Sequence, residues 1–161
     1  MTEAVAPPDE PVAEEAPVVP TRRLLVFLVG GMPAAAEMDT VREIVPSLPV
    51  TRLPGAPATV SGLINLRGTI VTVLDAGTYL GRSPWRRWGG LILLASYGER
   101  IIGLGIDDVR DIHDAAEDQF GAAPADAPPG VRGVVDIGNE RALLLDVQAI
   151  VREVLGQREG G

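Results

Sequence analysis

Two segments of the chain share one pattern of hydrophobic and polar positions. Val60–Asp75 reads VSGLINLRGTIVTVLD, and Val131–Asp146, 71 positions later, reads VRGVVDIGNERALLLD. In each segment two apolar runs flank a short polar turn, which is the signature of a β-hairpin. Similarity at a fixed offset indicates copies of one supersecondary unit. The pattern therefore predicts two similar small β units, and a functional site must lie on or between them.

Further apolar runs predict more strands around the first hairpin. Arg22–Val29 is the expected first strand, and Val50–Leu53 a brief later one. Gly90–Tyr97 and Arg100–Ile106 are expected to form another hairpin, with Val109–Ile112 extending its second strand. Short strands with regular turn signals favour barrels over a parallel sheet with crossover helices.

Three short segments have helical patterns. Apolar residues at helical spacing predict a helix over Glu37–Val45 that Pro46 ends. Ala76–Leu80 is expected to form one helical turn after Asp75, whose carboxylate is interpreted as an N-cap rather than as a reactive site. The last predicted helix ends at a cap on Gly156, and its apolar stripe consists of Val147, Ile150, Val151, Val154 and Leu155.

The composition limits the kind of core the chain can build. With 161 residues there is room for one domain or for two small subdomains that share a core. Hydrophobic residues make up 46% of the chain but aromatic residues only 4%, so the core must be aliphatic. The 19 glycines and 14 prolines indicate many tight turns between short strands.

The net charge of −8 is concentrated at the start of the chain. Residues 1–20 contain five acids and no base, and we expect them to form a disordered acidic tail rich in proline and alanine. The remaining 17 acids and 14 bases make a mildly acidic body, which argues against a nucleic-acid partner. Trp85-Arg86-Arg87-Trp88 is the one aromatic and basic cluster, and it is better interpreted as the approach to a strand.

The sequence predicts neither a membrane span nor a signal peptide. No apolar run approaches the length of a bilayer-spanning helix. The acidic start also lacks the positive charge and apolar stretch of a secretory signal. We therefore expect a cytoplasmic protein that does not insert into a membrane.

The search for a reactive centre finds no complete set of groups. The chain has no cysteine, one histidine (His113) and few serines, so no group of nucleophile, base and orienting residue emerges. Asp107, Asp111 and His113 lie in an acidic segment that could hold a metal ion. The segment lacks the spacing and central glycine of a calcium loop, and a solvated acidic edge is the simpler interpretation.

The turn of the first hairpin offers a candidate binding surface instead. Asn65 and Arg67 alternate with Ile64 and Leu66, so they should lie on the outer face of the strand. A nearby acid would orient the guanidinium of Arg67, and Glu43 is the candidate. The alternative is that Arg67 is simply a solvated turn residue.

The run GLINLRGTIVTVLD resembles the central signature of the CheW-type chemotaxis coupling proteins. The resemblance covers Arg22 to Leu155 in order and spacing. Other matching blocks are Leu25-Val26-Phe27, Gly30-Gly31, Val41–Ile44, Thr51–Pro57, Gly103–Val109, Arg132-Gly133 and Leu144–Asp146. It implies a mainly β fold of two five-stranded Src-homology-3-like barrel subdomains around a shared apolar core, with a short helix after the first strand and a C-terminal helix.

The resemblance also implies domain limits and a role. The domain would span residues 22–156, divided into barrels at 22–83 and 84–156, with a disordered end at 157–161. The role is that of a non-enzymatic adaptor between a chemoreceptor's cytoplasmic tip and the regulatory domain of a histidine autokinase at receptor arrays. No cofactor, metal or small-molecule substrate is implied. By position the partner-binding residues are Val41, Glu43, Gly62 and Arg67, to which we add Asn65 from its exposed side of the turn.

Some positions depart from the family pattern. Ala34–Ala36 stands where an aromatic residue is usual, which should thin the local packing, and Thr72 replaces a proline. The Ala34–Ala36 departure leaves one alternative, a divergent scaffold of the same fold that binds only one partner. The acidic segment leaves a second, a small metal-dependent enzyme using Asp107, Asp111 and His113.

Overall fold

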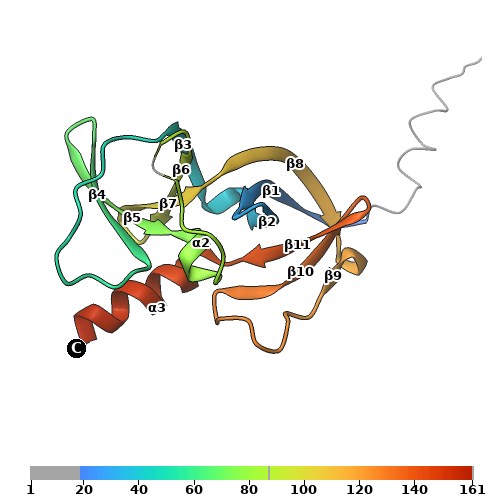
Figure 1. Cartoon of the computed structure of the whole chain (residues 1–161). Helices are drawn as coiled ribbons and strands as arrows, with labels where there is room; N and C mark the ends of the chain where they lie inside the picture. Colours follow the sequence, from blue (N-terminus) through green and yellow to red (C-terminus); the bar gives the residue numbers. More distant parts are fainter. Residues whose placement is uncertain (1–18, 87, 161) are drawn as a thin grey trace, which may run out of the picture.

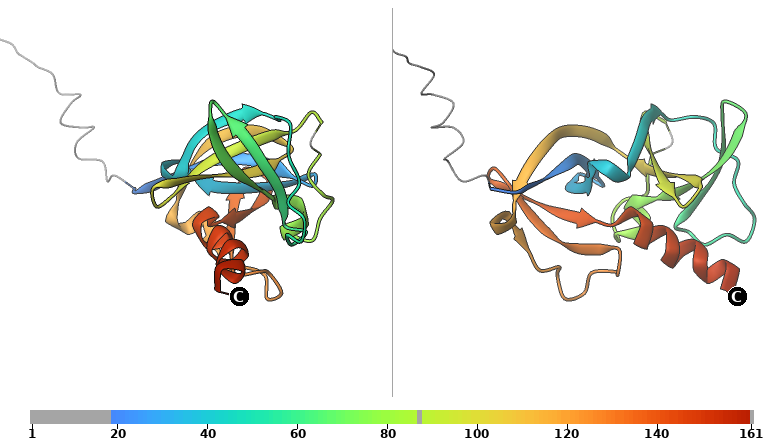
Figure 2. Two further views of the ribbon diagram at one scale, coloured as in Figure 1. Left: turned by 90° about the vertical axis from the view of Figure 1, so that its left-hand side faces the viewer. Right: turned by 180° about the vertical axis from the view of Figure 1, so that it is seen from behind.

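The computed structural model describes residues 19–86 and 88–160, with side chains up to residue 156 (Figure 1). The predicted disorder of the acidic tail falls on residues that lie mostly outside this range. The described chain is mainly β, and its strands form two sheets that close into Src-homology-3-like barrels. Figure 2 shows them side by side, with the C-terminal helix beginning near their junction and running along the barrel that holds β4 (Val60–Leu66) and β5 (Thr69–Asp75).

One barrel, here called the terminal barrel, combines strands from the two ends of the described chain. It contains β1 (Thr21–Val29), β2 (Met32–Glu37), β8 (Asp108–Ala116), β9 (Phe120–Gly121), β10 (Val131–Ile137) and β11 (Glu140–Leu145). Their order in the sheet is β8-β1-β2-β11-β10-β9. The barrel thus has one very short strand, β9, beyond the five predicted.

The other barrel, here called the central barrel, is built from the middle of the chain. It contains β3 (Val41–Pro46), β4 (Val60–Leu66), β5 (Thr69–Asp75), β6 (Leu91–Tyr97) and β7 (Arg100–Ile106). Their order is β3-β6-β7-β5-β4, so the described part of this barrel has the five strands expected. The predicted hairpins β4–β5, β6–β7 and β10–β11 are all confirmed.

The predicted division of the barrels at residues 83 and 84 is wrong. That boundary separates the two sequence repeats, but each barrel contains strands from both sides of it. The terminal barrel takes β1 and β2 from before the boundary, and the central barrel takes β6 and β7 from after it. The chain crosses between barrels at the 3-10 turn Met38–Thr40 and again at Asp107. Parallel pairs β5–β7 and β11–β2 then join strands of different repeats. The repeats are therefore intertwined, which local sequence patterns cannot reveal.

The repeated hairpins keep equivalent surroundings despite this exchange. A β-bulge falls between Val60 and Gly62 in one hairpin and between Val131 and Gly133 in the other. An added Cβ would lie 2.2 Å from the Thr51 carbonyl oxygen at Gly62, and 2.5 Å from the Gly121 carbonyl oxygen at Gly133. Both glycines thus permit close approach of a backbone segment.

The predicted strand Val50–Leu53 is reduced to a single bridge. Thr51 pairs with Leu63, its backbone N–H donating to the Leu63 carbonyl oxygen at 2.8 Å. In the terminal barrel the equivalent pairing is that of β9 with β10, where Gly121 faces Val134. The bridge is therefore the counterpart of β9, shortened to one residue.

Three apolar clusters fill the molecule. One lies inside the central barrel around Ile64, Val71 and Trp85, and a smaller one lies inside the terminal barrel around Leu24 and Val135. The largest cluster joins both barrels and the C-terminal helix, and its fully buried members include Phe27, Val29, Ala34, Ala36, Leu93, Leu104, Ile106 and Ile150. A core shared by the two barrels is thus present, as expected.

The helix predicted over Glu37–Val45 is wrong. Met38–Thr40 forms a 3-10 turn and Val41–Pro46 is strand β3, which pairs with β6. A bulge at Arg42 explains the helical spacing, because it adds one residue between Val41, opposite Ala95, and Glu43, opposite Leu94. The extra residue places Val41 and Ile44, three positions apart, against the same shared core.

The other helices begin where predicted. The Asp75 carboxylate caps α2 (Ala76–Tyr79) by accepting from the Thr78 N–H at 3.0 Å. The predicted apolar stripe of α3 (Val147–Gly160) is buried, but α3 continues past Gly156, which is therefore not its C-terminal cap. Val109–Ile112 does not extend β7 either, since it belongs to β8 and pairs with β1 in the other barrel.

Candidate partner-binding surface

The turn between β4 and β5 carries the predicted ion pair. Arg67 Nη2 lies 2.6 Å from Glu43 Oε1, which joins the hairpin to strand β3. The Arg67 side chain remains 66% exposed and that of Glu43 43% exposed, so both are open to a partner. The predicted pairing is present, although Glu43 projects from a strand rather than from the helix expected.

The local backbone fixes how Arg67 is presented. Arg67 has a φ of +51°, the one positive value among the described residues other than glycine. The side-chain oxygen of Asn65 accepts a hydrogen bond from the Gly68 N–H at 2.8 Å, which closes the turn. A residue in this left-handed conformation costs about 1–3 kcal/mol, and such strain is concentrated at functional sites. The turn thus fixes the backbone from which Arg67 projects, and Glu43 orients its guanidinium.

The five predicted site residues occupy different environments. Asn65, Arg67 and Glu43 are exposed, whereas Val41 is half-buried against the shared core and Gly62 is buried. Gly62 (φ +147°) lies beneath Thr51 and presents no side chain to a partner. The structure therefore brings Glu43 and Arg67 together at the surface and gives Gly62 a structural role. Whether these residues bind partners stays a prediction.

Ile70 is an exposed apolar residue that the sequence analysis missed. It is 61% exposed and stands opposite Asn65 across the β4–β5 ladder. Its strand neighbours Val71 and Val73 are buried, so Ile70 occupies an outward phase where a polar residue is expected. The sequence signal that could have revealed Ile70 is an apolar residue at an outward-facing position of the strand.

The terminal barrel has a corner of similar construction and reversed charge. Arg110 Nη2 of β8 lies 3.0 Å from Glu140 Oε2, at the start of β11. Here the base projects from the strand equivalent to β3 and the acid from the hairpin. The two barrels thus share their backbone plan but present opposite charge arrangements.

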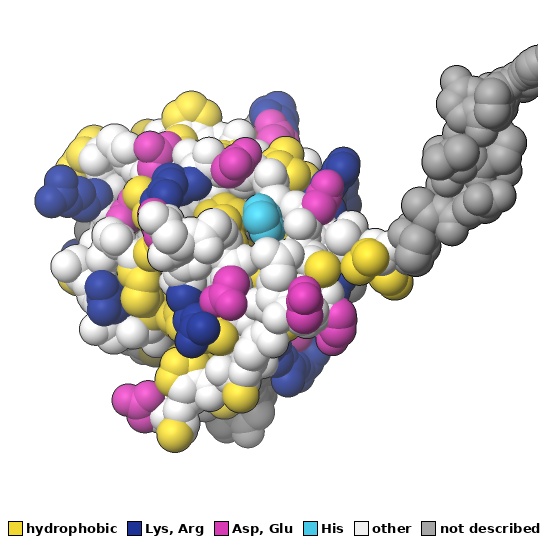
Figure 3. All heavy atoms as spheres, turned by 90° about the vertical axis from the view of Figure 1, so that its right-hand side faces the viewer, with side chains coloured by type: hydrophobic (Ala, Val, Ile, Leu, Met, Phe, Trp, Pro, Cys, Tyr) yellow, Lys and Arg dark blue, Asp and Glu magenta, His cyan; other side chains and the backbone are white. Residues whose placement is uncertain are grey.

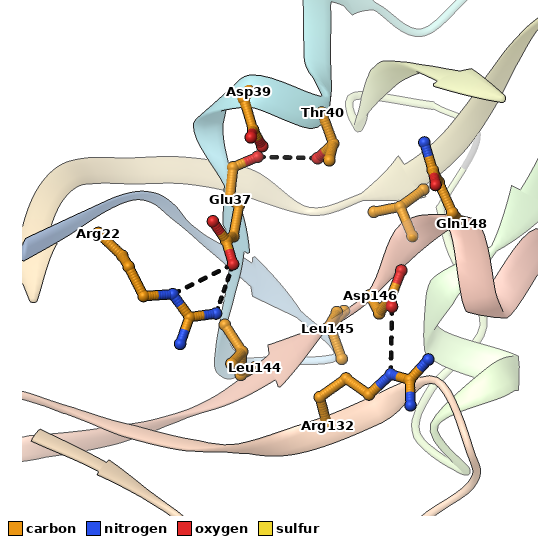
Figure 4. A pocket seen from close by; sticks show the side chains of 10 residues that line it. Arg22, Glu37, Asp39, Thr40, Arg132, Leu144, Leu145, Asp146 and Gln148 are labelled. Carbon is orange, nitrogen blue, oxygen red and sulfur yellow. Dashed lines mark hydrogen bonds and ion pairs between the residues drawn. The ribbon is translucent and has the colours of Figure 1, made fainter. Parts of the chain in front are cut away.

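A hollow lies where the terminal barrel meets α3 (Figure 4). It encloses about 320 Å³ and is lined by both apolar and charged side chains. Arg22 donates hydrogen bonds to Glu37, and Arg132 Nε lies 3.1 Å from Asp146 Oδ2. Both guanidinium groups are paired with carboxylates, so neither is left uncompensated to bind an anion in this hollow.

The ligand set of the metal-dependent alternative is not assembled. Among the residues that the structure describes, no three His, Cys, Asp or Glu side chains gather where they could hold a metal ion. Asp107 accepts from the Gly31 N–H and Asp111 from the Ile112 N–H. A hydrogen bond from Arg23 at 3.0 Å lowers the pKa of Asp114. These acids therefore act within turns, strands and ion pairs.

The charged surface and the helices add two observations. On the face seen in Figure 3, acidic and basic side chains are interspersed rather than gathered by sign. Such a distribution does not make the basic track that a nucleic-acid backbone requires. In the described residues, no helix is both long and apolar enough to cross a bilayer.

Comparison with known proteins identifies the family. Residues 23–155 match the CheW-like domain model, which covers most of the chain. The fold and the exposed turn define a twin-barrel protein with a charged corner on each barrel. The chain belongs to the CheW-like domain family.

Relatives and a solved structure agree with this assignment. The chain is 32% identical over 136 residues to the chemotaxis protein CheW of Rhizobium meliloti, covering 80% of this chain and 86% of that protein. It is 28% identical over 137 residues to a probable chemotaxis protein CheW of Rhizobium etli, covering 82% and 88%. The scaffolding protein TtCheW of Thermoanaerobacter tengcongensis has the same fold, with a TM-score of 0.71, 20% identity and coverage of 83% and 88%.

Proposed function

We propose that this chain is a non-enzymatic adaptor that couples the cytoplasmic tip of a chemoreceptor to the regulatory domain of a histidine autokinase. It acts in the cytoplasm at membrane-associated receptor arrays. Membership of a family with chemotaxis proteins and a scaffolding protein supports this role. The observation that carries the proposal is the exposed Arg67–Glu43 pair beside Ile70.

This surface has the chemistry of a protein contact. Ile70 offers apolar area that a partner can bury, and the adjacent charges can set the partner's orientation. Because Asn65 closes the turn, little loop freedom is lost on binding. A helical receptor hairpin with apolar and acidic residues on one face fits this combination.

An adaptor also needs two surfaces that can be occupied together. The Arg110–Glu140 corner of the terminal barrel is the reverse in charge of the Arg67–Glu43 corner. The acid lies on the strand and the base on the hairpin in one corner, and the reverse holds in the other. Surfaces that differ in this way can distinguish two partners. The reversed corners therefore support one contact on each barrel.

The test uses the purified full chain with a receptor tip fragment and with the kinase regulatory domain. We expect both to bind, and we expect kinase autophosphorylation to rise when receptor, kinase and chain are present together. Arg67→Glu should weaken receptor binding. Arg141→Glu is the matched control, because Arg141 is 67% exposed and also forms a surface ion pair, with Asp136 at 2.9 Å. Binding of neither partner would refute the adaptor role.

Binding of one partner alone would favour the divergent scaffold. The sequence basis for that alternative was Ala34–Ala36, which the structure places fully buried in β2. A departure at these positions alters packing rather than an exposed face. Coupling of two partners is therefore preferred.

A further inference from the structure

Two tryptophans three residues apart have opposite environments. Trp85 is 6% exposed, and its indole N–H donates to the Ile106 carbonyl oxygen at 3.1 Å. Its backbone N–H donates to the Asp75 carboxylate at 2.9 Å. Trp88, by contrast, is 90% exposed, the largest exposure among the exposed apolar side chains of the described chain. Trp85 therefore anchors the segment before β6 while Trp88 stands in solvent.

Trp88 separates two hollows. One of about 530 Å³ is lined by Trp88 and Arg86 together with Gly30, Gly31 and Asp107. The other, about 220 Å³, is lined by Trp88 with Ser47–Val50. A hydrogen bond from the Ser47 N–H to the Gly90 carbonyl oxygen, at 3.1 Å, holds this second wall in place. We call these hollows and Trp88 the Trp88 surface.

The Trp88 surface has the chemistry that recognises an extended proline-rich peptide. Such peptides dock on grooves with exposed aromatic rings, because proline pre-forms the extended conformation and reduces the entropy lost on binding. Exposed Arg86 lines the larger hollow and exposed Arg82 packs against Gly30 at its edge, so both add positive charge. Asp107, the acid in the same lining, accepts a hydrogen bond from the Gly31 N–H. Trp88 and the two arginines together favour a peptide that combines proline with acidic residues.

We propose that residues Pro7–Pro11 (PPDEP) of this chain dock on the Trp88 surface. They lie outside the described structure, and they combine three prolines with Asp9 and Glu10. Residues 1–20 carry five acids and no base, so their charge complements the arginines beside Trp88. The inference does not depend on coupling to a receptor or a kinase.

The length of the intervening chain fits this site. Strand β1 runs from Thr21 to Val29, about 27 Å at a rise of about 3.4 Å per residue, and ends at Gly30, which lines the larger hollow. An extended proline-rich segment running back along β1 would place Pro7–Pro11 about 31–43 Å from Thr21. Glu14 and Glu15 would be only about 20 Å away and would fall short.

A spin label tests the contact in the full chain. The chain has no cysteine, so Ala6→Cys provides a single attachment site beside Pro7–Pro11 and leaves Asp9 and Glu10 in place. In a ¹⁵N-labelled sample we expect the label to broaden the Trp88 indole N–H resonance. The broadening should decrease in the same chain carrying Arg86→Glu, and at high salt, which screens exposed charges.

Three outcomes would overturn the proposal. The first is broadening that neither Arg86→Glu nor high salt reduces, because a tethered segment that does not dock also broadens the resonance. The second is equal broadening in a mixture in which the spin label is on ¹⁴N chains and the ¹⁵N chains carry no spin label. The docked segment would then come from a second copy of the chain. The third is a pair of results: the spin label does not broaden the Trp88 indole resonance, and the Trp88 fluorescence shifts to the blue when anionic phospholipid vesicles are added. The Trp88 surface would then contact lipid.

Acrylamide quenching gives an independent measurement with a matched control. Subtracting the signal of Trp88→Phe isolates the emission of Trp88. Asp9→Lys/Glu10→Lys should increase quenching, because the segment no longer covers the ring. Glu14→Lys/Glu15→Lys makes the same change in charge on residues too near β1 to reach the site, and should leave quenching unchanged. Equal effects of both pairs would overturn the proposal.

Discussion

Arg67 Nη2 contacts Glu43 Oε1 at 2.6 Å across 24 positions of sequence. The contact links the β4–β5 turn to β3, the strand at the other end of the central sheet. It therefore forms only when the barrel is closed. The same pair is exposed, so its charges remain available to a partner.

The first prediction separates these roles by exchanging the charges. Arg67→Glu, Glu43→Arg and the double variant should each change the free energy of unfolding by at most about 1 kcal/mol, because exposed ion pairs contribute little. Receptor-tip binding should fall in both single variants and stay low in the double variant, since the partner meets a reversed arrangement. Denaturant titration and calorimetry measure the two effects. Restored binding in the double variant would mean that the pair only shapes the turn.

The second prediction concerns Gly62. Gly62→Ala would place a Cβ 2.2 Å from the Thr51 carbonyl oxygen at a φ of +147°, so the bridge between Thr51 and Leu63 must shift. We expect a loss of more than about 1–3 kcal/mol in the free energy of unfolding. Gly98→Ala is the control, because it also has a positive φ (+60°) but meets nothing within 4 Å. Equal losses would disprove a close-approach role for Gly62.

The third prediction compares two equivalent carboxylates. Asp75 is 7% exposed and accepts from the Thr78 and Trp85 N–H groups, so Asp75→Ala leaves two donors without their acceptor. Each loss costs about 1–3 kcal/mol. Asp146, its counterpart, is half-buried and accepts from the Ala149 N–H and from the exposed Arg132 side chain, so Asp146→Ala should cost about 1–2 kcal/mol. Urea unfolding of the two variants measures the difference, and a larger loss for Asp146→Ala would contradict this account.

The fourth prediction concerns alkaline stability. Burial and a hydrogen bond to Glu153 at 2.5 Å raise the pKa of Tyr79. The folded protein therefore holds the phenolic proton more tightly than the unfolded chain does. This stabilisation is intact below the ordinary tyrosine pKa of about 10 and is lost as pH rises above it toward the folded value.

Tyr79→Phe should accordingly make the free energy of unfolding fall less steeply with pH above about 10. It should also lower stability at neutral pH, because the Gly130 N–H loses the hydroxyl that accepts its hydrogen bond at 2.8 Å. Tyr97→Phe serves as the control. Urea titrations at a series of pH values measure both effects, and an unchanged slope would refute the assignment.

The hairpins were predictable because their information is local. Alternating apolar positions around a polar turn specify β4–β5 and β10–β11, whatever the rest of the chain does. Asp75 as an N-cap and the apolar stripe of α3 follow from equally local spacing. The pairing of Glu43 with Arg67 was inferred because an outward-facing guanidinium group is oriented by a nearby carboxylate.

The failures arose where one residue changed the period of the pattern. The bulge at Arg42 shifted a strand into the spacing of a helix, which is why β3 was mistaken. Asp107 redirected the chain so that β8 left the barrel of β7. In both places the hydrophobic pattern continues, but the partner strand comes from elsewhere in the chain.

The sequence by itself determined the two repeated hairpins and the starts of α2 and α3, because each depends on residues within a few positions of one another. Its composition also determined that the core is aliphatic. Only the tertiary structure decided which strands share a barrel and that Trp85 is buried while Trp88 is exposed. Those outcomes depend on contacts such as Leu143 beside Ala34 and Trp85 against Gly105, between segments that are distant or separately patterned. Local periodicity decides which face of a strand a side chain lies on. Closure of the barrel decides which other strands or helices that face packs against.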